Sequence, residues 1–102
     1  MNIAIFYIPV KDQEEASRLG QLAIEQRLAA CANVFPIHSL YPWDGQLQQD
    51  HEHVLLLKTV PSKTDELQSF IQQHHSYEIP CILHWEAGVN ERYGNWMLDQ
   101  IR

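Results

Sequence analysis

Residues 2–10 form an almost continuous apolar run rich in β-branched side chains, which predicts a first β-strand. Both of its alternating sets of side chains are apolar, so the pattern predicts burial on both faces of the strand. The sets are Ile3, Ile5 and Tyr7 on one side and Ala4, Phe6 and Ile8 on the other.

A helical pattern follows this strand. Asp12 is the expected N-cap, and Glu15, three residues later, is its expected capping-box partner. Gly20 either weakens this helix or allows it to pack closely on a sheet. The inward stripe at helical spacing consists of Ala16, Leu19, Leu22 and Ala23.

A long β-hairpin is predicted in the middle of the chain. Its strands are residues 31–43 and 47–60, and the Asp44–Gly45 pair is a strong turn signal between them. Pro36 and Pro42 cannot donate to a ladder, so the first of these strands should lie at a sheet edge or contain bulges.

The last third of the chain predicts three further elements. Ser62 starts a second helix with Asp65 at the capping spacing, residues 79–87 predict a fourth strand, and a terminal helix begins near Asn90. The inward or aromatic positions are Leu67, Phe70, Ile71 and His74 in the second helix, and Tyr93, Trp96, Met97 and Ile101 in the last.

This order predicts an α+β fold over residues 1–102: a single ferredoxin-like βαββαβ domain with an antiparallel sheet, plus a C-terminal helix. The strand order expected for such a fold is 4-1-3-2. Two helices cover only one face of a sheet, yet residues 54–57 and the first strand are apolar on both faces. We therefore expect the open face to be buried by self-association, and the long hairpin to reach a neighbouring subunit.

Composition narrows the classes of function. The net charge is −6, with seven Lys and Arg and no basic cluster, so the footprint of a nucleic-acid binder is missing and anionic lipid would be repelled. No run approaches the ~20 apolar residues that span a bilayer, and no signal peptide is recognisable. We expect a cytoplasmic protein with neither nucleic acid nor membrane as a partner.

Catalysis is not indicated by the sequence. There is no Gly-rich phosphate loop, no Gly-x-Ser-x-Gly and no His-Glu-x-x-His, so we do not expect an enzyme. Two cysteines, Cys31 and Cys81, are too few for a secreted disulfide scaffold and are expected to be reduced thiols.

Several separated motifs stand out along nearly the whole chain. They are Leu28–Val34, Pro36, Ser39, Tyr41, Trp43, Gly45, Leu57–Thr59, His74, His75, Tyr77, Glu78, Pro80, Tyr93 and Trp96. Together, and in this order, they resemble the motifs of the CutA, or divalent-cation tolerance, family. The chain departs from the family at one position, because Pro80 is followed by Cys81 instead of the usual glutamate.

The resemblance implies a ferredoxin-like homotrimer linked to tolerance of copper and other divalent cations, and to binding of such cations. No cofactor is required on this interpretation, and copper or another divalent cation is the expected ligand. The family's assembly resembles that of PII signalling proteins. The alternatives are therefore a PII-like small-ligand sensor or adaptor with an intersubunit cleft, and a trimeric scaffold for another protein.

Cys31 and His75 are the predicted metal ligands. A thiolate suits copper(I), and Cys31 lies in the family signature, although a small buried side chain is the alternative. Histidines at the end of a helix can instead cap it. Cys81 should lie on the opposite sheet edge from Cys31, so the two could share a site only across a subunit boundary. His51 and His53 can chelate a metal from one strand face, or form part of a solvated hairpin.

Lys58, Tyr77 and Glu78 are the predicted ligand-binding residues. Lys58 stands among apolar residues, so it needs a carboxylate partner such as Glu52 or Glu78, or an anionic ligand, unless its head reaches solvent. The predicted interface anchors are Tyr41, Trp43, Trp85 and Trp96.

Overall fold

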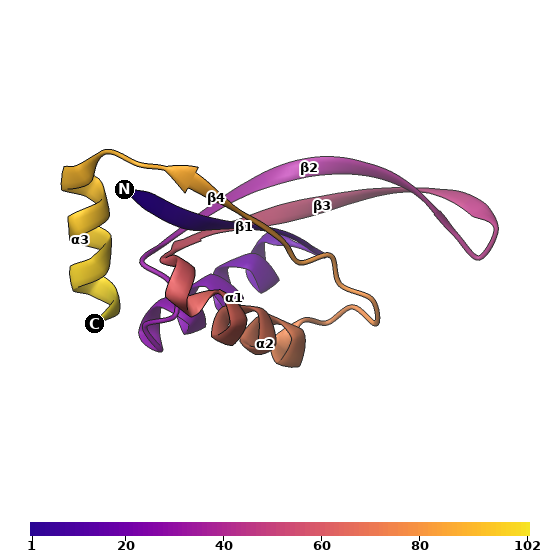
Figure 1. Ribbon diagram of the computed structural model, residues 1–102. Coiled ribbons are helices and arrows are strands. Elements are labelled where there is room, and N and C mark those ends of the chain that lie inside the picture. The colour runs from indigo at the N-terminus through magenta and orange to yellow at the C-terminus, as the bar shows by residue number, and fades with distance from the viewer.

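The computed structural model describes all 102 residues and confirms the predicted fold class (Figure 1). The four strands form one antiparallel sheet in the order β2-β3-β1-β4, which is the expected order. The elements are β1 Asn2–Val10, α1 Gln13–Glu25, β2 Cys31–Trp43, β3 Gln46–Thr59, a 3-10 turn Pro61–Lys63, α2 Thr64–His74, β4 Leu83–Gly88 and α3 Glu91–Ile101.

The core lies between the sheet and the helices α1 and α2, which cover the same face (Figure 1). Phe6 and Ile8 of the central strand β1 are fully buried there and pair with Leu57 and Leu55 of β3. Gly20 lets α1 approach the sheet, because a Cβ at this position would lie 3.0 Å from Cβ of Ala32. The sequence-based suggestion of close packing at this glycine is confirmed.

The opposite face of the sheet stays largely uncovered. Helix α3 packs at one end of the sheet, where Met97 and Ile101 join Ile3 and Val60 in a second apolar cluster. Beyond that end, large apolar side chains on the uncovered face remain accessible to solvent. They include Phe35 at 38% exposed, Leu83 at 52% and Trp85 at 43%.

The β2–β3 hairpin extends beyond the helical layer and accounts for the elongated shape, 46 × 23 × 21 Å (Figure 1). Its ladder runs without a bulge from Cys31↔Lys58 to Trp43↔Gln46. The turn residues Asp44 and Gly45 both have positive φ, 52° and 74°, as a two-residue hairpin turn requires. Strand β2 lies at the sheet edge, so its prolines interrupt no inner ladder.

Three local predictions need correction. Pro61 starts a 3-10 turn, so α2 begins at Thr64 and Ser62 does not cap it. His74 is exposed, not buried in the inward stripe, and its Nδ1 donates to the Phe70 carbonyl at 2.8 Å. Strand β4 begins only at Leu83, opposite Tyr7.

The late start of β4 has a physical cause in β1. Pro9 carries no N–H to donate to a neighbouring strand. Its carbonyl accepts a hydrogen bond from Nε2 of His75 at 2.9 Å, so a side chain takes the place of a ladder partner. The chain before β4 is therefore a loop. No helix of this fold is long and apolar enough to cross a membrane.

Candidate functional site

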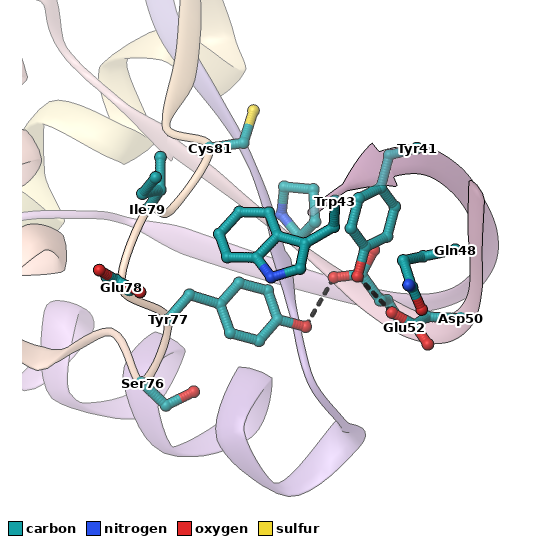
Figure 2. Close-up of a pocket in the computed structure, with 11 residues that line it drawn as sticks. Tyr41, Trp43, Gln48, Asp50, Glu52, Ser76, Tyr77, Glu78, Ile79 and Cys81 are labelled. Carbon is teal, nitrogen blue, oxygen red and sulfur yellow. Dashed lines mark hydrogen bonds between the residues drawn. The ribbon is translucent and has the colours of Figure 1, made fainter. Parts of the chain in front are cut away.

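A cleft of about 580 Å³ opens between the hairpin and the α2–β4 loop, residues 75–82 (Figure 2). The hairpin contributes aromatic and acidic side chains, and the loop contributes the aromatic side chain of Tyr77 and the residues at the rim of the cleft. The lining residues are Pro9, Tyr41, Trp43, Gln48, Asp50, Glu52, Ser76, Tyr77, Glu78, Ile79 and Cys81.

Glu15 of α1 holds the base of the α2–β4 loop. Its side chain is 3% exposed and accepts hydrogen bonds from the backbone N–H of Ser76 and from the Ser76 hydroxyl, both at 2.9 Å. It also accepts from the N–H of Lys11 at 3.2 Å, while its own N–H donates to Asp12 at 2.8 Å. Of the predicted capping box, the Asp12 side chain caps the N–H of Glu15, whereas the Glu15 side chain accepts from Lys11 and not from Asp12. Glu15 also fixes the loop through Ser76.

His75 holds the same loop from the other side. Its Nε2 donates to the carbonyl of Pro9, and its Nδ1 accepts the N–H of Tyr77 at 3.0 Å. Both ring nitrogens are therefore engaged, and a metal ion at either one would displace a hydrogen bond. In this geometry His75 positions Tyr77 in the cleft.

The ionisation of Glu15 contributes to stability in a predictable direction. Burial opposes its charge, but the hydrogen bonds from Ser76 and Lys11 outweigh burial and lower the pKa of Glu15 below 4.5. A carboxyl whose pKa is lower in the folded state stabilises the fold above its unfolded pKa, and this stabilisation is lost as pH falls through the folded pKa.

We expect Glu15→Gln to lower the free energy of unfolding by about 2 kcal/mol at neutral pH, because it weakens charge-assisted hydrogen bonds to the loop. The gap between variant and wild type should shrink as pH falls below about 4.5. Denaturant melts between pH 3 and 7 measure both effects. Glu14→Gln, an exposed neighbour in the same helical turn, is the control. An unchanged gap at low pH would contradict the account.

Two phenol–carboxylate pairs form the polar centre of the cleft (Figure 2). The hydroxyl of Tyr77 donates to Glu52 at 2.6 Å, and the hydroxyl of Tyr41 donates to Asp50. Asp50 and Glu52 are two residues apart on β3, so both point to the uncovered sheet face. The cleft thus places two carboxylates side by side.

The ionisable side chains that line the cleft are acidic or phenolic, apart from the Cys81 thiol. Burial, together with the hydrogen bond to Glu52, raises the pKa of Tyr77, and the hydrogen bond to Asp50 raises the pKa of Tyr41. Glu78 adds a third carboxylate at the rim, and no Lys, Arg or His lines the cleft. The site is therefore suited to a cation or a neutral ligand.

Tyr77→Phe should destabilise the protein by about 1–3 kcal/mol, because it leaves the buried carboxylate of Glu52 without its donor. Equilibrium unfolding in urea measures the change. Tyr7→Phe is the matched control, since the Tyr7 hydroxyl makes no hydrogen bond within the chain. Equal effects of the two substitutions would show that the Tyr77–Glu52 bond contributes nothing specific.

The remaining predicted site residues lie elsewhere. Lys58 forms no ion pair within the chain, so neither Glu52 nor Glu78 is its partner there, and its Nζ lies over the Tyr93 ring, 5.5 Å from the centroid. Cys31 pairs with Lys58 across the strands. Trp85 lies on the uncovered sheet face, and Trp96 lies on α3 with its ring 5.5 Å from that of Tyr93.

The two predicted metal ligands are far apart within one chain. Cys31 of β2 pairs with Lys58 of β3, which in turn pairs with Ile5 of β1. His75 instead donates a hydrogen bond to Pro9, which lies four residues and roughly 13 Å further along β1. No three His, Cys, Asp or Glu side chains of one chain converge where they could hold a metal ion. A complete set of protein ligands would need a second subunit.

Sequence reasoning gave Tyr77 and Glu78 as ligand-binding residues and Tyr41 and Trp43 as interface anchors, and the structure brings all four to one cleft. It missed Asp50 as a site residue and gave Glu52 only as a partner for Lys58. The available signal was their two-residue spacing on the predicted hairpin, just beyond Gln48, which pairs with Tyr41.

The comparisons with known proteins agree with the fold. The family model described as CutA1 divalent ion tolerance protein matches residues 4–100. The divalent-cation tolerance protein CutA of Archaeoglobus fulgidus is 38% identical over 97 residues, which cover 93% of this chain and 94% of that protein. The chloroplastic CutA of Arabidopsis thaliana is 30% identical over 100 residues, and the chain spans 55% of its length.

Two solved structures have nearly the same fold as this chain. The divalent ion tolerance protein CutA1 of Ehrlichia chaffeensis has a TM-score of 0.95 at 29% identity, and the match covers 99% of this chain and 96% of that one. The Archaeoglobus fulgidus protein, described as a periplasmic divalent cation tolerance protein, has a TM-score of 0.94 at 30% identity, with 98% and 99% covered.

Proposed function

The chain belongs to the CutA1 divalent ion tolerance family, and from this membership we propose that it is a homotrimer that binds divalent cations, copper among them, in the acidic cleft. One observation carries the proposal: Asp50 and Glu52 lie side by side in a cleft that contains no basic side chain. A cation between them would relieve their mutual repulsion.

The donor set suits a partly hydrated ion. Carboxylate oxygens bind hard divalent cations, which retain several waters, and borderline ions such as copper(II) also accept oxygen ligands. With two carboxylates from one chain, water or a neighbouring subunit would complete the coordination. The hairpin, which extends past the helical layer, is the element that could bring a neighbour to the cleft (Figure 1).

The uncovered sheet face supports assembly. On this face Trp85 and Leu83 of β4 pair with Ile5 and Tyr7 of β1, and both are about half exposed. Soluble proteins rarely leave such a patch in water, and a cyclic assembly would cover it in every copy. Family resemblance sets the proposed number of subunits at three.

Cys31 is a separate proposal for copper(I). Its free thiol is half-buried on the uncovered face, where a neighbouring subunit could supply a second ligand. Within one chain the adjacent Lys58 ammonium opposes a cation there. We therefore assign divalent ions to the cleft, and keep Cys31 for the softer ion.

A second function is favoured by the size and walls of the cleft. Small-molecule sites commonly measure ~300–1,000 Å³ and have aromatic walls, and here Trp43 and Tyr77 provide such walls around 580 Å³. A PII-like sensor of a neutral or cationic small molecule would use the same residues. The acidic centre disfavours nucleotides.

Asp50→Asn combined with Glu52→Gln should weaken copper(II) or manganese(II) binding at least about tenfold, because the amides keep the size of both side chains but remove their charge. Calorimetric titration of the purified protein measures the affinity. Glu86→Gln, which removes an exposed carboxylate on β4 outside the cleft, is the control. Cys31→Ser is titrated with copper(I) in parallel.

Unchanged binding in the cleft variant would reject this site. An equal loss in Glu86→Gln would show that general surface charge is responsible. Binding of nucleotides or other small molecules without any cation would favour the sensor function instead.

A further inference from the structure

The other face of the hairpin carries a pair of histidines that the cleft does not use. His38 of β2 pairs directly with His51 of β3, and both side chains are exposed. Their ring centroids are 5.0 Å apart, with the rings inclined at 55°. Their side chains alternate with those of Asp50 and Glu52 along β3, so the pair and the cleft lie on opposite faces of the strand.

This spacing matches that of two imidazoles on one metal ion. With metal–nitrogen bonds of about 2.0–2.1 Å, each ring centroid lies about 3.2 Å from the metal. If the nitrogen–metal–nitrogen angle is tetrahedral, the two ring centroids lie about 5 Å apart. If that angle is 90°, as in a tetragonal copper(II) site, they lie about 4.5 Å apart. The observed separation falls in this range without movement of the backbone.

The hydrogen bonds of the pair leave ring nitrogens available. Nε2 of His38 lies 3.4 Å from Oε1 of Gln49, which is an acceptor for an Nε2–H. That bond would fix the tautomer in which Nδ1 carries the free lone pair, and metal-ligating histidines are typically oriented by such a second contact. Neither ring nitrogen of His51 has a hydrogen-bond partner in the chain. By contrast, both nitrogens of His75 are engaged.

We propose that His38 and His51 form a second metal site, specific for borderline transition metals such as Zn²⁺, Ni²⁺ and Cu²⁺, on the outer face of the hairpin. Imidazole suits these ions and not the hard cations that carboxylates prefer. Water completes the coordination, because no third protein ligand converges there. The site is independent of the cleft and does not rest on the function proposed for it.

His53 is not a ligand of this site. It lies two residues beyond His51 on the same strand face and is half-buried opposite Pro36. The sequence spacing of His51 and His53 suggested chelation within one strand. The structure instead pairs His51 with His38 across the hairpin, at a distance that already fits a metal.

The test is a titration of the purified protein with Zn²⁺ and Ni²⁺, carried out in the Asp50→Asn/Glu52→Gln background so that the cleft does not contribute. We expect one ion per subunit in that background. His38→Asn and His51→Asn should each weaken binding at least about tenfold, since even the loss of an orienting contact costs 10–100-fold. His84→Asn is the control, because His84 is an exposed histidine on another strand, bonded to Gln68.

Electron paramagnetic resonance of bound Cu²⁺ gives a second readout. Two nitrogen ligands should appear in the cleft-variant background, and one in each histidine variant. Wild-type affinity in His38→Asn and His51→Asn, an equal loss in His84→Asn, or the absence of nitrogen ligands would each overturn the proposal. If the cleft substitutions alone leave cation binding intact while the histidine substitutions abolish it, the cleft function fails and this site stands.

Discussion

Trp85→Glu is expected to convert the proposed trimer into monomers at micromolar concentration. Trp85 is 43% exposed on the uncovered sheet face beside Ile5, where the proposed assembly would bury it. A carboxylate buried there without a partner costs several kcal/mol, and a threefold assembly repeats the cost three times. Sedimentation velocity measures the change directly.

Ile24→Glu is the matched control for this substitution. Ile24 is 41% exposed, almost as much as Trp85, but it lies on α1, on the side of the sheet that the helices already cover. The same change from apolar to acidic should leave the trimer intact. Dissociation of both variants, or of neither, would show that the uncovered face is not the assembly surface.

Trp43→Ala is expected to weaken the trimer more than the fold of the subunit. Trp43 ends β2 at the tip of the hairpin and is 44% exposed, so its own chain covers only part of the indole. Tryptophan is typical of interface hot spots, where truncation costs about 2 kcal/mol or more. Three independent sites would then lose on the order of 6 kcal/mol per trimer.

Thermal melts at several protein concentrations, with light scattering at each, separate assembly from folding. Leu47→Ala is the control, because Leu47 lies on the same hairpin and is 66% exposed, but its side chain points to the other face. A Trp43→Ala protein that stays trimeric at nanomolar concentration, and melts lower independently of concentration, would place Trp43 in the subunit core.

The fold could be predicted because each element carries its own local signal. Pro36 and Pro42 placed β2 at an edge, and the Asp44–Gly45 turn set the hairpin register for all of β2 and β3. The apolar residues on both sides of β1 predicted a sheet with one face left to cover. Errors were confined to element ends, where a single side chain decides: Pro61 displaced the start of α2, and His75 took the place of a strand partner.

The site could be predicted only in part, because it depends on which residues a long hairpin and a loop bring together. Tyr77 was identifiable from its motif, but its partner Glu52 is 25 residues away in sequence. The sequence offered Glu52 only as one possible partner of Lys58, which contacts Tyr93 instead. Likewise, the pairing of His38 with His51 follows from the strand register, whereas sequence spacing favoured His51 with His53.

Anomalous diffraction from crystals grown with copper(II) shows whether a divalent cation binds in the acidic cleft. We expect an anomalous peak about 2–2.5 Å from carboxylate oxygens of Asp50 and Glu52 in every subunit of the proposed trimer. A cleft without a peak in crystals whose copper lies only at other positions would contradict it.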